Sequence, residues 1–199
     1  MSRRRIGVFG GSFDPVHFGH LILAQEAIAR LKLARLLFVP AARPAHKRRR
    51  RLAGVEHRLA MLRLATRGNA SFGVSSIEAE RGGISFTAVT LELLARAERA
   101  EIFFLMGQDS LEEFHTWREP ERIARLARLA VLPRGEGEVP RLPPPLRGRV
   151  VLLRSPRIGI SSTEIRRRLR RSLPVRYWVP DPVLAYAARH GLYGIRRPR

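Results

Sequence analysis

Two histidines and two adjacent glycines lie close together in residues 10–20, near the start of the chain. Glycines let the backbone approach a phosphate closely, and a helix that follows them directs its partially positive N-terminus at the same group. His17 and His20 are three residues apart, so on the first helical turn both rings lie on one face, where imidazole N–H groups can contact nucleotide phosphates. Asp14-Pro15 fixes the turn before them. The stretch therefore predicts a phosphate-binding loop.

A purely structural interpretation of residues 10–20 is also open, in which Asp14 caps the helix and both histidines are incidental. The combination of glycines, Asp-Pro and two histidines in one short window favours the functional interpretation, and it is not the GxGxxG fingerprint of a dehydrogenase. The segment resembles the GxFDPxHxGH signature of the nucleotidylyltransferase superfamily. That resemblance implies ATP contacts from Gly10, Gly11, Ser12, Phe13, His17 and His20.

The same resemblance implies a second phosphate-binding element of the form ISSTxIR near the C-terminus, and residues 160–166 match it. Ser161 and Glu164 predict a capping box, so a helix begins there with N–H groups and hydroxyls at its mouth and Arg166 one turn in. A capping box alone is common and structural, but its pairing with the first signature favours a role in catalysis. The resemblance implies ATP contacts from Ile160, Ser161, Ser162, Thr163 and Arg166, and stabilisation of developing charge by His17, His20 and Arg166.

Over nearly its full length the chain resembles one family of that superfamily, nicotinate-nucleotide adenylyltransferase. The segments that carry the resemblance are PAHK at 44–47, SFTA at 85–88, MGQDS at 106–110, FHTW at 114–117 and the closing segment 182–193. The implied reaction transfers the adenylyl group of ATP to nicotinate mononucleotide, giving deamido-NAD and pyrophosphate in NAD biosynthesis. Related enzymes that use nicotinamide mononucleotide or pantetheine phosphate share the phosphate motifs and are the alternatives. Mg²⁺ is expected to enter with ATP, because no carboxylate cluster for a metal site of the protein's own is evident.

The resemblance also assigns side chains to each substrate. It implies ATP contacts from Gly107 and Asp109, and nicotinate mononucleotide contacts from Lys47, Phe86, Thr87, Asp109, Trp117 and Arg134. Structural interpretations stand beside these: Lys47 opens a basic run typical of a solvated loop, Asp109 can cap a following helix, and Trp117 can belong to the core. Some positions depart from the family pattern: Phe86 stands where many relatives have tyrosine, Arg118 replaces an aromatic or polar residue, and residues 132–135 resemble the family's R-P-G turn only loosely.

The elements that must position these residues alternate along the chain. Apolar runs predict strands at 5–9, 36–39, 72–77, 101–106, 129–132 and 150–153. Helical spacing predicts helices at 21–33, 55–66, 86–97, 109–114 and 120–126, with two more closing the chain. This order predicts an α/β fold, a Rossmann-like doubly wound parallel sheet with flanking helices, in a single domain over 1–199 whose C-terminal helical part, about 160–195, completes the ATP site. Ligands of such sheets lie beyond the carboxyl ends of the strands, where residues 10–20 fall. Residues 43–51 and 133–145 are predicted surface loops.

Composition narrows the remaining choices. The formal net charge of +21 suggests nucleic-acid binding as one function. The basic residues are spread along the chain, however, which favours a general compositional bias together with an anionic small substrate. A basic nucleic-acid-binding module is the alternative from another class.

The absence of cysteine excludes disulfides, zinc-thiolate sites and thiol nucleophiles. No apolar run approaches the roughly 18 to 20 residues that span a bilayer, and no signal-peptide core is evident, so a cytoplasmic protein with no membrane partner is expected. The oligomeric state stays open, with a homodimer among the alternatives.

Overall fold

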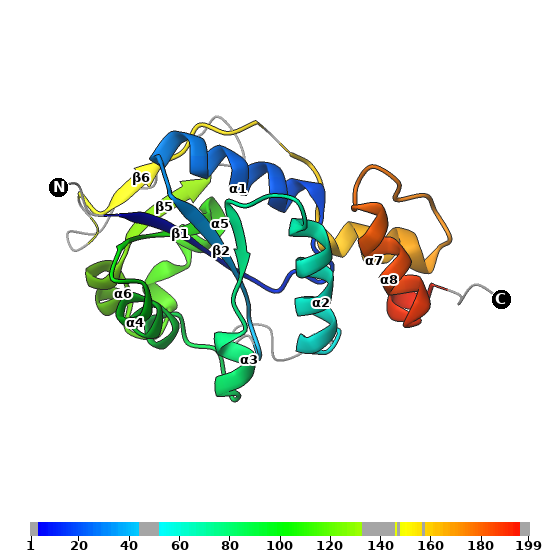
Figure 1. Cartoon of the computed structure of the whole chain (residues 1–199), viewed down its shortest axis with the longest axis horizontal. Helices are drawn as coiled ribbons and strands as arrows, with labels where there is room; N and C mark the ends of the chain where they lie inside the picture. Colours follow the sequence, from blue (N-terminus) through cyan, green and yellow to red (C-terminus); the bar gives the residue numbers. More distant parts are fainter. Residues whose placement is uncertain (1–3, 44–51, 133–145, 147, 157, 196–199) are drawn as a thin grey trace.

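A six-stranded parallel sheet forms the centre of the protein in the computed structural model, which describes residues 4–43, 52–132, 146, 148–156 and 158–195 (Figure 1). The strand order is β3-β2-β1-β4-β5-β6, and every paired neighbour is parallel. The strands are β1 (Arg5–Gly11), β2 (Arg35–Pro40), β3 (Phe72–Val74), β4 (Glu101–Gly107), β5 (Arg128–Leu132) and β6 (Val150–Leu152). The order reverses direction at β1, as in a doubly wound sheet, which confirms the predicted fold class.

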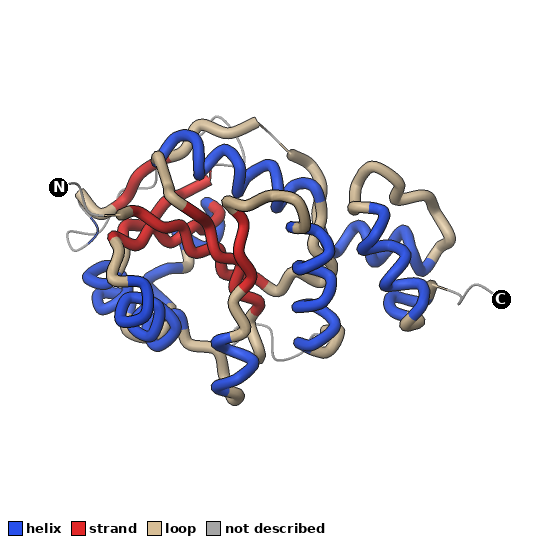
Figure 2. Tube along the Cα trace, viewed as in Figure 1, coloured by secondary structure: helices blue, strands red, loops and turns tan. Residues whose placement is uncertain are grey.

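Helices follow most of the strands (Figure 2). They are α1 (Phe18–Leu31), α2 (Val55–Thr66), α3 (Ile77–Arg81), α4 (Thr87–Glu98), α5 (Gln108–Glu112), α6 (Pro120–Leu126), α7 (Ser162–Arg170) and α8 (Asp181–Arg189). Two 3-10 turns, η2 (Phe114–Thr116) and η4 (Leu192–Gly194), complete the described part of the chain. No described helix combines the length and the apolar character needed to cross a membrane.

Each face of the sheet has its own apolar cluster, because successive side chains of a strand point to opposite faces. On one face Phe9 and Phe38 pack with Ala24 and Ala27 of α1 and with Leu62 of α2. On the other face the helices α4 and α6 cover the remaining strand residues. Those buried strand residues are Ile6, Val8, Leu37, Val39, Ile102, Phe104, Met106, Leu129 and Val131. Both faces are therefore covered, as buried parallel sheets require.

The C-terminal helices α7 and α8 lie beside α2, away from the sheet (Figure 1). Ile165 of α7 and Val183 of α8 are fully buried and join the same apolar cluster as α1 and α2. Helices α7 and α8 are thus packed against the end of the sheet at which the loop after β1 emerges.

Most predicted boundaries lie within two residues of the observed ones, and three predicted elements differ by more. The predicted strand 72–77 ends at Val74, and Ile77 instead begins α3, because Ser76 is its N-cap residue and the Ser75 hydroxyl accepts the N–H of Ile77 at 3.4 Å. The helix predicted from residue 21 begins at Phe18. The helix predicted over 109–114 is split into α5 and η2, and the N-cap of α5 is Gly107, so the capping role considered for Asp109 is wrong.

Candidate active site

The loop between β1 and α1 lies at the carboxyl edge of the sheet. The ring of Phe13 anchors this loop, since it is fully buried and lies 5.5 Å from the Phe9 ring and 5.6 Å from the Phe38 ring. Phe13 itself adopts a left-handed backbone conformation with φ of 46°. The Asp14–Pro15 peptide bond that follows is cis. Because the Phe13 side chain is in the core, any contact of this residue with ATP falls to its backbone.

The two histidines of the loop stack on each other at the start of α1. His17 is the N-cap residue and His20 lies in the first turn, and their ring centroids are 3.7 Å apart. The backbone N–H of His17 donates to Nδ1 of His20 at 3.3 Å, so the ring hydrogen of a neutral His20 is on Nε2. A methyl group at Gly19 would lie 3.0 Å from Nδ1 of His17, so glycine makes room for the stacked ring. The predicted shared face of the two histidines is confirmed.

His17 is buried, with 5% of its surface exposed. Burial lowers the pKa of His17 from 6.5 to about 4, so the ring is neutral at pH 7. Its Nδ1 is buried and has no hydrogen-bond partner within the described part of the chain. At neutral pH the imidazole of His17 is therefore a neutral hydrogen-bonding group and not a cation.

This burial links the stability of the protein to pH. Between pH 6.5 and 4 the unfolded chain binds a proton at His17 and the folded chain does not, so the free energy of unfolding falls as pH is lowered through this window. At about 1.4 kcal/mol per pKa unit, the loss attributable to His17 is about 3 kcal/mol. Urea denaturation of the wild type and of His17→Gln at pH 7 and pH 4 measures it. We expect the variant to lose less stability than the wild type on acidification, and equal losses would contradict the assignment.

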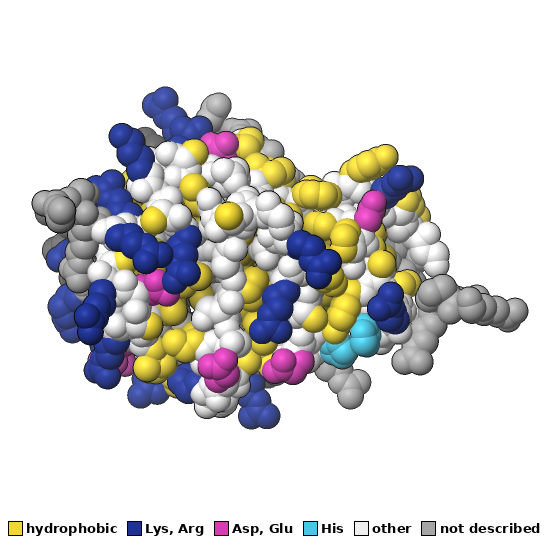
Figure 3. All heavy atoms as spheres, in the orientation of Figure 1, with side chains coloured by type: hydrophobic (Ala, Val, Ile, Leu, Met, Phe, Trp, Pro, Cys, Tyr) yellow, Lys and Arg dark blue, Asp and Glu magenta, His cyan; other side chains and the backbone are white. Residues whose placement is uncertain are grey.

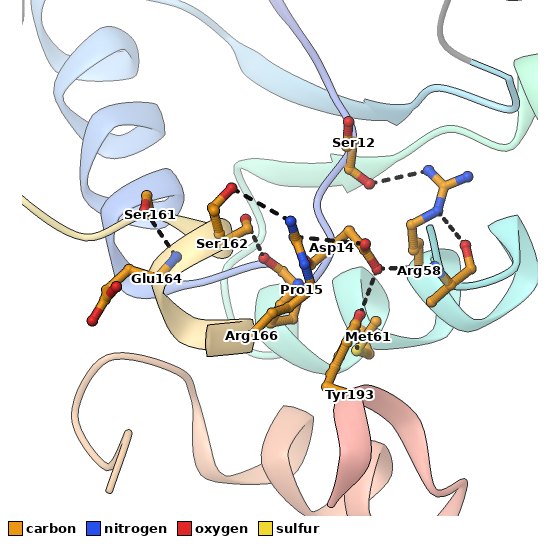
Figure 4. Close-up of polar contacts among 12 residues, drawn as sticks. Ser12, Asp14, Pro15, Arg58, Met61, Ser161, Ser162, Glu164, Arg166 and Tyr193 are labelled. Atoms are coloured by element: carbon orange, nitrogen blue, oxygen red, sulfur yellow. Dashed lines mark hydrogen bonds and ion pairs between the residues drawn. The ribbon is translucent and has the colours of Figure 1, made fainter. Parts of the chain in front are cut away.

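The C-terminal signature forms the start of α7 and contacts the loop after β1 directly (Figure 4). The Ser162 hydroxyl donates to the carbonyl of Pro15 at 2.9 Å, and the Arg166 guanidinium donates to the carbonyl of Asp14. A second Arg166 nitrogen lies 3.4 Å from the Thr163 hydroxyl. The two predicted phosphate-binding elements, far apart in the sequence, are therefore joined by hydrogen bonds.

The predicted capping box of α7 is only half formed. Ser161 is the N-cap residue, and its hydroxyl accepts the N–H of Glu164 at 3.2 Å. The Glu164 carboxylate instead accepts two hydrogen bonds from Arg167, at 2.6 and 2.5 Å. This ion pair keeps the one acidic side chain of the first turn engaged with a cation, so less negative charge faces the mouth of the helix.

Arg58 of α2 ties three segments around the site together. It is almost completely buried, and its guanidinium donates to the carbonyls of Ser12, Ala42 and Ala53 at 3.0, 3.3 and 2.9 Å. Burial lowers the pKa of Arg58, and the nearby charge of Asp14 opposes that shift. Arg58 belongs to none of the sequence motifs, although its place among apolar residues on one face of a helix is a signal of burial in the sequence.

Asp14 is the second buried charge of the site. Its Oδ1 accepts the hydroxyl of Tyr193 at 2.7 Å and the N–H of Ala53 at 3.2 Å, and its Oδ2 lies 3.6 Å from an Arg166 nitrogen. Tyr193 lies in η4, close to the C-terminal end of the described chain. The sequence placed Asp14 and Tyr193 in family motifs without assigning either to the site.

The described residues among those predicted to bind the acceptor lie near the end of β4 and the start of α4. Trp117 is half-buried, with its ring 5.5 Å from Phe114 and 6.2 Å from Phe104. The Arg118 guanidinium lies over the Phe86 ring, 4.4 Å from its centroid, which gives a physical role to a residue that departs from the family pattern. Phe86 is the N-cap residue of α4 and Thr87 its first residue.

The remaining predicted site residues divide into two groups. Gly107 ends β4, the strand that pairs with β1, so Gly107 and Asp109 begin α5 at the same edge of the sheet as the loop after β1. Lys47 and Arg134 lie outside the described residues, as do the rest of the 44–47 motif and the proline-rich segment 133–145.

Comparison with known proteins agrees with the fold and the motifs. Residues 8–168 match the family described as Cytidylyltransferase-like. A protein of Thermomicrobium roseum named "Probable nicotinate-nucleotide adenylyltransferase" is 47% identical over 95% of this chain and 91% of its own length. A Thermus thermophilus protein of the same name is 46% identical, with 95% of this chain and 99% of that protein covered.

Solved structures are similar at lower identity. The structure of Plasmodium falciparum nicotinic acid mononucleotide adenylyltransferase complexed with NaAD superposes with a TM-score of 0.78 over 98% of this chain and 100% of that one, at 17% identity. At this identity the similarity supports the fold alone. The sequence relatives, in contrast, match almost the full chain at 44 to 47% identity. The predicted family is confirmed, and the chain belongs to the nicotinate-nucleotide adenylyltransferases.

Proposed function

We propose that the chain transfers the adenylyl group of ATP to nicotinate mononucleotide, giving deamido-NAD and pyrophosphate. The observation that carries this proposal is the hydrogen bond between the Ser162 hydroxyl and the Pro15 carbonyl, which brings the two phosphate-binding elements to one place. Residues 1–199 act as one catalytic domain in this proposal, and the C-terminal part from about residue 160 to 195 completes the ATP site. NAD biosynthesis is the corresponding pathway, and a cytoplasmic location is its natural setting.

In the proposed reaction an oxygen of the nicotinate mononucleotide phosphate attacks the α-phosphorus of ATP. A new phosphorus–oxygen bond forms, the bond between the α-phosphorus and the bridging oxygen breaks, and pyrophosphate leaves. The nucleophile is already an anion at neutral pH, so a general base contributes little and catalysis rests on alignment and on stabilisation of charge. No covalent intermediate with the protein is needed.

The loop after β1 and the start of α7 supply the groups that stabilise charge. The first turn of α1 contains no acidic residue, so the partial positive charge at its N-terminus is not opposed locally. Neutral His17 and the Nε2–H of His20 donate hydrogen bonds, and Arg166 supplies the full positive charge. The guanidinium of Arg166 has five N–H donors, which allows it to hold Asp14 and a phosphate oxygen together.

ATP contacts are proposed from both elements and from the edge of the sheet. The backbone of residues 10–13 and 160–163 approaches the phosphates, and Gly107 and Asp109 lie near the ribose. ATP enters as its Mg²⁺ complex, in which phosphate and water oxygens hold the ion. Among the described residues no three His, Asp or Glu side chains are grouped to hold a metal ion.

Trp117 is proposed as the surface on which the nicotinate ring stacks. The indole ring of Trp117 packs against Phe114 and Phe104, so its orientation is fixed before the substrate binds. Thr87 and Phe86 at the start of α4, together with Lys47 and Arg134, complete the proposed acceptor site.

Trp117→Ala should raise KM for nicotinate mononucleotide by about tenfold and leave KM for ATP nearly unchanged, since base–aromatic stacking contributes about 1 to 3 kcal/mol. Steady-state kinetics with each substrate varied in turn measures both constants. Trp178→Ala, at the other tryptophan of the chain, serves as the comparison for general effects of losing an indole. Equal increases in the two KM values of Trp117→Ala would contradict stacking on the acceptor.

An acceptor assay tests the function as a whole. Purified protein is offered MgATP with nicotinate mononucleotide, nicotinamide mononucleotide or phosphopantetheine, and pyrophosphate release is followed. The proposal requires the highest kcat/KM with nicotinate mononucleotide. A preference for either of the other acceptors would support adenylyl transfer but contradict nicotinate mononucleotide as the substrate.

The alternative from another class, a nucleic-acid-binding module, rests on the net charge of +21. On the face seen in Figure 3, lysine and arginine side chains are scattered over the surface and do not gather in one patch. Scattered charge favours weak, salt-sensitive binding of polyanions. A gel shift that persists well above physiological salt, with no pyrophosphate release, would favour this alternative.

A further inference from the structure

We propose that Tyr193 is a positioning residue for adenylyl transfer, because its hydroxyl holds Asp14 at the centre of the contacts between the phosphate-binding loop and α7. This inference rests on the proposed function for the identity of the reaction. The contact itself joins η4, near the end of the described chain, to the loop after β1 (Figure 4).

The hydrogen bond from Tyr193 reaches a carboxylate that has few other donors within the described part of the chain. The hydroxyl lies 2.7 Å from Oδ1 of Asp14, and the N–H of Ala53 also donates to this oxygen, at 3.2 Å. Asp14 is 1% exposed, so water cannot replace a lost donor at low cost. The tyrosine hydroxyl is therefore a main determinant of where the Asp14 side chain lies.

The position of Asp14 in turn affects groups that face the phosphates. Its carbonyl accepts a hydrogen bond from Arg166, and its Oδ2 is 3.6 Å from the same guanidinium. Pro15, the next residue, accepts the Ser162 hydroxyl. A shift of Asp14 would thus move the loop after β1, Arg166 and the start of α7 relative to one another.

The backbone of Tyr193 supports a role beyond packing. Its φ of 60° and ψ of 18° are left-handed, a conformation that costs energy for any residue other than glycine. The side chain is held in place by the bond to Asp14 and by a 3.9 Å approach of its hydroxyl to the sulfur of Met61. Burial, followed by the negative charge of Asp14, raises the pKa of Tyr193, so the hydroxyl keeps its proton and remains a donor.

A second tyrosine offers a matched control. Tyr186 lies in α8, is also partly buried, and its hydroxyl lies 3.0 Å from Nδ1 of His57 on α2. Tyr186→Phe and Tyr193→Phe each remove one hydroxyl that connects the C-terminal segment to another part of the protein. Only Tyr193→Phe removes a contact to the phosphate-binding loop.

The test compares the two variants with the wild type in melting temperature, kcat, both KM values and the affinity for MgATP by calorimetry. We expect similar decreases in melting temperature for both. For Tyr193→Phe alone we expect kcat to fall on the order of tenfold, because misaligned reacting groups lose rate more than binding. KM for nicotinate mononucleotide should stay within about twofold and the affinity for MgATP should weaken about threefold.

Two results would overturn the proposal. If both variants lose kcat equally, the hydroxyls act only by anchoring the C-terminal segment. If Tyr193→Phe keeps the wild-type kcat and MgATP affinity, Asp14 does not depend on Tyr193. A wild-type protein that binds MgATP and releases no pyrophosphate would refute the proposed reaction, and the calorimetric comparison of the two variants would still decide the role of Tyr193.

Discussion

His20→Ala is expected to lower kcat by on the order of 10² or more, with a modest change in the affinity for ATP. In the proposed reaction the lost donor acts mainly where charge develops, on the bridging oxygen and the pyrophosphate, so the transition state should lose more stabilisation than the ground state. The hydrogen bond from the His17 backbone to Nδ1 of His20 keeps the ring hydrogen on Nε2 in the resting protein. The donor is therefore oriented before ATP binds, which is the condition for a large electrostatic contribution.

Steady-state kinetics with saturating nicotinate mononucleotide measures this effect, and calorimetry with MgATP separates binding from turnover. His190→Ala is the control, because His190 is an exposed histidine at the C-terminal end of α8, where its ring lies 4.2 Å from the ring of Tyr186, and its loss changes the same residue type. An unchanged kcat in His20→Ala would remove His20 from the mechanism. A loss of ATP affinity as large as the loss of kcat would assign it to ground-state binding.

The strand–helix alternation and the two phosphate motifs could be predicted from the sequence because both are local patterns. The short apolar run and the glycine pair that follows it define β1 and the loop after it. Ser161 marks the start of α7 within one turn. The parallel sheet then follows from helical crossovers between strands, since parallel strands need such connections. The contact between the two motifs was implied by the family resemblance.

The contacts that hold the site could not be predicted in the same way. Tyr193 and Asp14 are separated by almost the whole chain, and their hydrogen bond depends on how α8 and η4 pack against α2. Arg58 was missed because a single arginine in a helix is most often exposed, although Leu59 and Leu62 are buried beside it. Residue types give donors and acceptors, whereas their pairing depends on the tertiary structure.

The error at 72–77 has a local cause. Phe72, Val74 and Ile77 read as one apolar run, but the Ser75 hydroxyl accepts the backbone N–H of Ile77, and Ser76 is the N-cap residue at which α3 starts. Serine competes for backbone N–H groups and favours helix starts over strand interiors. Glu78 in the new helix is buried and accepts the Thr90 hydroxyl and the N–H of Ala42, so the missed helix also supports the segment after β2.

Arg58→Met is expected to lower the free energy of unfolding by roughly 3 kcal/mol or more, the largest effect on stability that the site predicts. Methionine keeps an unbranched apolar stem and removes all five N–H donors. The carbonyls of Ser12, Ala42 and Ala53 then lose their charge-assisted partner in a place that water reaches poorly. Each acceptor left without a donor costs about 1 to 3 kcal/mol when fully buried.

A competing term reduces this cost without reversing it. Burial of the guanidinium is itself unfavourable, as its lowered pKa indicates, and methionine relieves that penalty. The penalty is already offset in the wild type by the three hydrogen bonds and by the nearby charges of Asp14 and Glu78. Removing the cation takes a nearby positive charge away from these two buried carboxylates, so the net change remains destabilising.

Urea denaturation followed by circular dichroism measures the change, and Arg63→Met provides the control on the exposed face of the same helix. We expect Arg63→Met to stay within about 0.5 kcal/mol of the wild type. Arg58→Lys should fall between the two, because one ammonium cannot span three carbonyls that lie around a planar guanidinium. If Arg58→Met unfolds with the same urea midpoint as the wild type, the three segments hold their places without Arg58. The loop after β1 would then be stabilised by its contacts with the sheet alone.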